Sequence, residues 1–135
     1  MKQSKRLVLF TLAVVSIIFA FTTTYSYAYD IAIDVSPNVL NIQSQSTIVT
    51  VHTDIAYNIV DGASVYLNGV AINWWKSDDR GNFVAKFLSE EIKTLDGLII
   101  GDYNTLALSG FTDGGEAFIG TQDIMVINNI PAGKK

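Results

Sequence analysis

Cysteine is absent from the 135-residue sequence, and histidine occurs only once, at His52. Without thiols the chain forms no disulfide and no thiolate metal site, so the fold must rest on its apolar core alone. The single histidine excludes a histidine cluster, and no serine lies in a nucleophile-elbow context. Glu90 and Glu91 are consecutive, a spacing that does not aim two carboxylates across a cleft. We therefore predict that the protein is not an enzyme.

Lysine and arginine are also scarce. The chain has 9 Lys and Arg against 13 Asp and Glu, and three of the cations lie within residues 1–6. From Tyr29 onward the net charge is 6 − 13 = −7. Nucleic-acid binding and polybasic docking to anionic lipid both need clustered cations. We expect neither kind of partner.

The N-terminal residues show a three-part pattern that is typical of a secretory signal peptide. Cations in residues 1–6 precede an apolar run at 7–21, and small polar residues then lead to Ala28. A spanning helix needs about 20 apolar residues, which favours cleavage after Ala28 over retention as an anchor. No cysteine follows the run, so a cysteine-linked lipid anchor is excluded. We predict a signal peptide at 1–28 and a protein that is secreted, in the extracellular space or the cell envelope, without stable membrane insertion.

The residues that follow are enough for one domain and not for two. Short segments of alternating apolar and polar residues, separated by turn signals, recur along them. This pattern predicts an all-β fold, an antiparallel sandwich of seven to eight strands with one short helix, at residues 29–129. A polar tail follows at 130–135. The inward phase of the four strongest strands predicts the shared core: Val65, Leu67, Phe83, Phe87, Leu106, Leu108, Ile124 and Val126.

Several local features are specific enough to predict. Residues 64–87 read as a three-stranded meander, in which Asn68 and Gly69 supply the positive φ angles of a two-residue hairpin turn. Residues 54–63 break the alternation and are expected to cross the surface between strands. Ser89 is expected to cap the short helix.

Four segments carry a family resemblance: VYLNGVAI, NFVAKF, TLALSGF and FTDGGEAFIGTQDIMVI. Together they resemble an immunoglobulin-like β-sandwich repeat of secreted and cell-surface proteins of bacteria and archaea, over residues 31–127. The resemblance implies an immunoglobulin-like fold and a calcium-binding loop after the strand that ends in Leu-Asn-Gly. In this sequence the matching positions of that loop are Asp78, Asp79 and Asn82.

These three side chains leave a calcium sphere incomplete, because the ion takes about six to eight oxygen ligands. The loop is shorter than the family's, and Arg80 stands where another oxygen ligand is expected. The alternative is a solvated hairpin turn with Gly81 at a positive φ angle. We favour the turn, and hence no cofactor.

Exposed aromatic residues are the other candidates for binding. Trp74 and Trp75 are adjacent on an expected strand, so their rings point to opposite faces and one is expected in the core. The other is expected to be partly covered by the sandwich or to form a stacking platform. The candidate ligand-binding residues are Trp75, Tyr66 and Tyr103.

Two functions follow from these features. The first is a non-catalytic structural or adhesive interaction module, which binds a protein or glycan surface partner through surface patches and sheet edges. The alternative is a module that binds carbohydrate or another small ligand, with calcium as a structural ion. A glycan binder should show an outward aromatic residue in a shallow groove lined by Asp or Asn. An adhesive module should show an uncovered apolar patch or strand edge.

Overall fold

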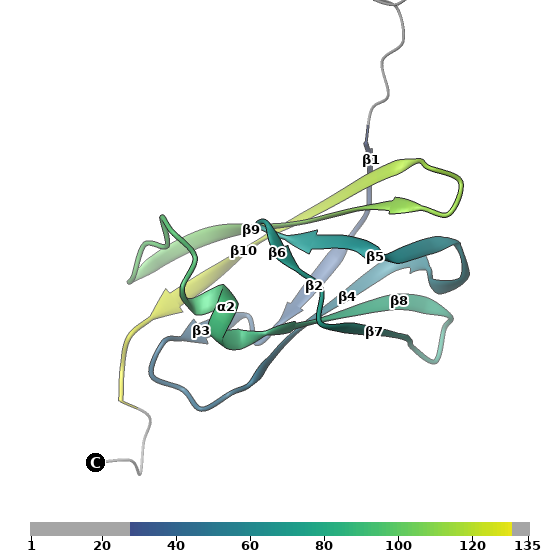
Figure 1. Ribbon diagram of the computed structural model, residues 1–135. Coiled ribbons are helices and arrows are strands. Elements are labelled where there is room, and N and C mark those ends of the chain that lie inside the picture. The colour runs from purple at the N-terminus through teal and green to yellow at the C-terminus, as the bar shows by residue number, and fades with distance from the viewer. Residues whose placement is uncertain (1–27, 131–135) are drawn as a thin grey trace, which may run out of the picture.

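The computed structural model describes residues 28–130, which form two β-sheets packed face to face and one short α-helix (Figure 1). The predicted signal peptide and polar tail lie outside the described residues, apart from Ala28 and Ile130. Within residues 28–130, no helix is long and apolar enough to cross a membrane. The all-β prediction is confirmed, although the strands number ten, six in one sheet and four in the other.

Sheet 1 has five strands in a continuous order, and a sixth shares an edge with the first. In order these are β1 (Tyr29–Asp30), β10 (Ala117–Ile127), β9 (Asp102–Thr112), β5 (Val60–Leu67) and β6 (Val70–Ala71), with β3 (Val39–Asn41) also paired to β10. Both β1 and β3 run parallel to β10. Because β9 occupies one edge of β10, they share the opposite edge.

Sheet 2 has four strands in the order β2 (Ile33–Ser36), β4 (Ile48–Ala56), β8 (Asn82–Leu88) and β7 (Trp74–Ser77). All three pairings are antiparallel. The strand β7 therefore lies at a free edge of this sheet.

The core lies between the sheets, and all eight residues predicted for it are at most 1% exposed. Side chains from both sheets contribute, including Phe83 and Phe87 from β8 and Leu106 and Leu108 from β9. Every buried apolar side chain of the described region falls within residues 35–126. A chain that begins at Tyr29 thus contains the whole core.

The predicted meander at 64–87 is wrong, because its first two strands and its last strand belong to different sheets. Asn68 and Gly69 do form the expected hairpin turn, with φ angles of 47° and 83°, and β6 pairs with β5. After only two paired residues, Ile72 packs against the core and the chain passes into sheet 2. Because Ile72 packs against the core, the connection from β6 to β7 crosses the side of the sandwich from one sheet to the other instead of continuing along sheet 1.

The predicted surface crossing at 54–63 is also wrong. Strand β4 continues to Ala56, and only the 3₁₀ turn η1 (Tyr57–Ile59) separates it from β5. Thr53 interrupts the apolar alternation in the sequence, yet it faces inward and its hydroxyl donates to the carbonyl of Phe83 at 2.6 Å. A satisfied hydroxyl lets the strand carry a polar residue into the interior.

The short helix is confirmed as α2 (Ser89–Lys93), but Ser89 does not cap it. Leu88 occupies the N-cap position, and the buried Ser89 hydroxyl has no hydrogen-bond partner. Ile92 is buried in the core and so anchors the helix against the sandwich.

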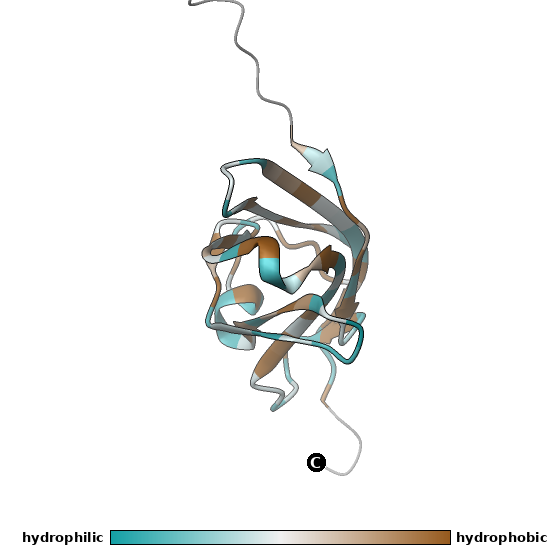
Figure 2. Cartoon of the chain, turned by 90° about the vertical axis from the view of Figure 1, so that its right-hand side faces the viewer, coloured by the Kyte–Doolittle hydropathy of each residue, from teal (hydrophilic) through white to brown (hydrophobic). Residues whose placement is uncertain are grey.

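Three connections gather at the opposite end of the molecule from α2, the end that faces the viewer in Figure 2. They are η1, the β7–β8 turn and the β9–β10 turn. The N–H of Tyr57 donates to the carbonyl of Gly81 at 2.9 Å, and the N–H of Asp113 donates to the carbonyl of Ile59 at 2.8 Å. These bonds tie the two hairpin turns to η1.

Candidate functional site

The three aromatic residues predicted to bind a ligand do not share one groove. Tyr66 on β5 and Tyr103 on β9 lie on the outer face of sheet 1, whereas Trp75 lies on β7 in sheet 2. Tyr66 is paired with Ser109, six residues along β9 from Tyr103. At about 3.4 Å per residue the two tyrosines are separated by about 20 Å along the sheet. The structure therefore divides these candidates between different surfaces.

Neither tryptophan lies in the core, which corrects the expectation for one of them. Trp74 is 44% exposed and Trp75 is 38% exposed. Trp75 is level with Ala85 of β8 and so faces the interior side of sheet 2, but at its edge. Its ring lies directly on Gly62 of β5, where an added Cβ would overlap the ring atoms. Trp75 thus closes the side of the sandwich, which explains why it is only partly covered.

The outer face of sheet 1 carries three well-exposed aromatic side chains. Tyr66, Phe111 and Tyr103 are 44%, 50% and 63% exposed. Sequence reasoning missed Phe111, although it continues the odd-numbered outward phase of β9 that begins at Tyr103. Strand register places three carboxylates on the same face, because Asp61 pairs with Phe111, Asp123 with Thr105 and Asp30 with Ile119. We call this surface the acidic aromatic face: Tyr66, Tyr103, Phe111, Asp30, Asp61 and Asp123.

The six strands of sheet 1 contain no Lys or Arg. The described residues hold four such cations against 13 Asp and Glu, a net charge of 4 − 13 = −9. One of the four, Lys93, lies on α2, where its Nζ donates to the carbonyl of Ser44 at 2.8 Å. The other three are Lys76, Arg80 and Lys86, and all belong to the β7–β8 hairpin.

Two of these cations, Lys76 and Lys86, lie beside a tryptophan on the outer face of sheet 2. Trp74 pairs with Lys86, whose Nζ lies 5.5 Å from the centroid of the Trp74 ring and donates to Oγ1 of Thr50 at 2.8 Å. Lys76 lies on the same face, two residues along β7. Burial lowers the pKa of Lys86 below its ordinary value of 10.5, and the charge of Lys76 lowers it further. We call Trp74, Lys76 and Lys86 the Trp74 patch.

The cations of the hairpin differ in their carboxylate neighbours: Arg80 lies in the turn with Asp78, whose pKa its charge helps to lower, whereas Lys76 and Lys86 have no close carboxylate among the described residues. Within residues 28–130 the single ion pair shorter than 4.0 Å joins Lys93 to Glu90, at 3.9 Å. Lys76 and Lys86 thus lack a carboxylate at that distance in a region that carries 13 of them. Val84 lies beside Lys76 on the same outward face but is fully buried, so the side chains of this surface shield an apolar floor.

The predicted calcium residues lie in a tight turn in which one carboxylate oxygen of Asp78 already accepts two hydrogen bonds. Oδ1 of Asp78 accepts the N–H of Arg80 at 2.8 Å and that of Asn82 at 2.9 Å, and Gly81 has a φ angle of 80°. The bond from the Asn82 N–H is the largest cause that lowers the pKa of Asp78. Asp79 lies in the same turn. In the described part of the chain, no three His, Asp or Glu side chains are grouped so that they could hold a metal ion.

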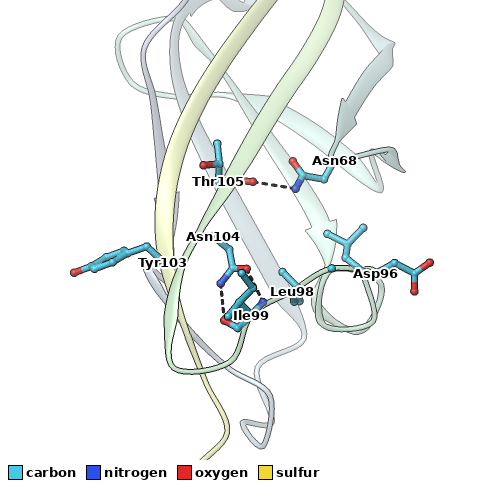
Figure 3. Close-up of a pocket in the computed structure, with 9 residues that line it drawn as sticks. Asn68, Asp96, Leu98, Ile99, Tyr103, Asn104 and Thr105 are labelled. Atoms are coloured by element: carbon cyan, nitrogen blue, oxygen red, sulfur yellow. Dashed lines mark hydrogen bonds between the residues drawn. The ribbon is translucent and has the colours of Figure 1, made fainter.

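A hollow of about 430 Å³ between β9 and the loop after α2 combines Tyr103 with amide and carboxylate side chains. Its amides are engaged within the protein. Asn104 donates to the carbonyl of Ile99 at 2.9 Å and accepts its N–H at 2.7 Å, while Asn68 bonds to the backbone of β9. Figure 3 shows that the ring of Tyr103 points away from Asn104 and Ile99. The hollow therefore has the composition of a glycan groove but few free polar groups.

Comparison of the chain with protein-family models, with curated proteins and with solved structures finds no match.

Proposed function

We propose that the protein is a secreted, non-catalytic interaction module of the cell envelope or extracellular space, with an immunoglobulin-like fold. The immunoglobulin fold places strands A, B, E and D in one sheet and strands G, F and C in the other, with C′ beside C in variable-type domains. Lettering β2, β4, β5, β6, β7, β8, β9 and β10 in chain order as A, B, C, C′, D, E, F and G reproduces both sheet orders. This correspondence supports the fold part of the proposal.

The observation that carries the functional part is the acidic aromatic face. Aromatic residues are enriched in protein–protein interfaces, and their large apolar area is unfavourable when left in water. No helix or loop of the described chain covers Tyr66, Phe111 or Tyr103, which are 44% to 63% exposed. Because its aromatic side chains are spread over two paired strands, with Tyr66 and Tyr103 about 20 Å apart, the face suits a partner surface better than a small ligand.

The alternative, a glycan-binding module, is favoured by one observation: the hollow that Tyr103 and Asp96 help to line. Sugars need free hydrogen-bonding groups in addition to an aromatic platform. The internal bonds of Asn104 and Asn68 remove two such groups. We therefore place this function second.

The test compares two variants of the purified chain that begins at Tyr29. One carries Tyr66→Ser and Phe111→Ser on the face, and the other carries Asp96→Ala in the hollow. Each is used to retain partners from an envelope extract of the source cells and is screened on a glycan array with and without calcium. We expect the hollow variant to retain a protein from the extract that the face variant does not retain. We expect neither variant to give a signal on the glycan array. An array signal that Asp96→Ala abolishes would instead support the glycan-binding alternative.

A further inference from the structure

We infer that the partner of the acidic aromatic face is the Trp74 patch of a second copy of the same chain. This inference rests on the proposed function, since it identifies the occupant of the same face. The two surfaces belong to opposite sheets, so both are available on each molecule (Figure 1).

Charge is the first reason for this choice. The acidic aromatic face carries Asp30, Asp61 and Asp123 without a cation, and the Trp74 patch carries two cations, Lys76 and Lys86, without a carboxylate of the described chain within 4.0 Å. Opposite potentials across an interface steer association and reject wrong partners. The chain therefore contains both halves of one complementary pair.

The apolar groups of the two surfaces match as well. Trp74 is 44% exposed at the centre of its patch, and Phe111 is 50% exposed beside Asp61. The ring of Trp74 on one copy can stack on the ring of Phe111 on the other. The cations beside Trp74 can then pair with the carboxylate beside Phe111. Lys76 has no hydrogen bond or ion pair within the described residues, so its ammonium group is free to pair with a carboxylate of the second copy.

Symmetry then decides the form of the assembly. A two-fold contact between two acidic aromatic faces would oppose carboxylates to carboxylates, so the complementary contact is head-to-tail. Such a contact leaves one surface of each copy free, so each copy can bind two neighbours and the assembly can grow into a ring or an open chain. The face measures on the order of 35 Å by 14 Å across three strands, or roughly 500 Å² per partner, which is below the standard of about 800 Å². We expect weak association that grows with concentration.

Sedimentation velocity on the chain that begins at Tyr29 tests this inference with two variants. The patch variant carries Trp74→Ser and Lys76→Glu, and the face variant carries Asp61→Lys and Phe111→Ser. A control variant, Glu91→Lys with Ile99→Ser, makes the same types of change as the face variant near α2. Thermal melting establishes that all variants are folded.

The wild type and the control should sediment faster as concentration rises, whereas the patch and face variants should stay monomeric. In an equimolar mixture of those two variants, the patch variant supplies an intact acidic aromatic face and the face variant supplies an intact Trp74 patch. The mixture should therefore form dimers that do not grow further. A wild type that stays monomeric, or a patch variant that still associates, would overturn the inference. In either case the retention experiment would still decide whether the face binds a different partner. Binding of an anionic polysaccharide such as polygalacturonate to a monomeric wild type, lost in the patch variant, would also overturn it.

Discussion

The outer faces of the two sheets differ far more than their inner faces do. Both inner faces carry the same kind of buried aliphatic and aromatic side chains, which any sandwich of this size needs. The outer face of sheet 1 carries exposed aromatics and carboxylates, while that of sheet 2 places Lys76 and Lys86 beside Trp74. Folding requires neither arrangement. This difference underlies our proposal that the outer faces serve binding, and substitutions on the inner and outer faces should separate folding from binding.

The largest effect is expected from Phe87→Ala on the inner face of β8, compared with Lys76→Ala on the outer face of β7. Phe87 is fully buried, so its truncation leaves a cavity and should cost about 3–5 kcal/mol of the free energy of unfolding. Lys76 is exposed and should change stability by less than about 0.5 kcal/mol. Urea unfolding measures both values. Equal losses would mean that the assignment of inner and outer faces is wrong.

A smaller effect is expected where the two sheets meet at the side of the sandwich. Gly62→Ala places a methyl group where the ring of Trp75 lies, so the ring must move, at a cost of about 1–3 kcal/mol. Tryptophan emission should shift to longer wavelength as Trp75 becomes more exposed. Gly114→Ala is the control, because its Cβ would lie 3.7 Å from Oγ1 of Thr112, an ordinary contact. Identical effects of the two substitutions would contradict the packing of Trp75 on Gly62.

The Asp78 turn should make a pH-dependent contribution to stability. Backbone hydrogen bonds hold the folded pKa of Asp78 below its ordinary value of 3.8. A carboxyl group whose pKa is lower in the folded state than in the unfolded state stabilises the fold at pH values above its unfolded pKa. This contribution is lost as the pH falls through the folded pKa. Asp78→Ala should therefore lower the melting temperature at neutral pH, and its difference from the wild type should shrink below pH 3.8. A difference that grows on acidification would show that the sign is wrong.

The smallest effect is expected from calcium. Oδ1 of Asp78 already accepts two backbone N–H groups, and Arg80 lies between Asp79 and Asn82 in the sequence. We expect less than about 2 °C of difference in melting temperature between excess chelator and millimolar calcium, because a filled site would add several degrees. A larger calcium-specific shift that Asp78→Ala or Asp79→Ala abolishes would restore calcium as a structural ion.

Sequence patterning predicted the inner faces well and the outer faces poorly, for a physical reason. Alternation with a period of two reports which side chains avoid water, and all eight residues predicted for the core are buried. It does not report where a chain changes sheet, so the passage from β6 to β7 was missed. It also does not report what covers an outward residue. Trp75 is placed by a glycine on another strand, and Phe111 becomes part of the acidic aromatic face only through its register with Asp61.

The most direct test of the account is an amide chemical-shift map of the ¹⁵N-labelled chain that begins at Tyr29, recorded at increasing concentration. If the outer faces of two copies meet, shifts should grow together around Phe111 and Tyr66 on sheet 1 and around Trp74 and Lys76 on sheet 2, while the hollow around Asp96 stays unchanged. Shifts confined to the hollow, or to only one of the two faces, would contradict the head-to-tail contact.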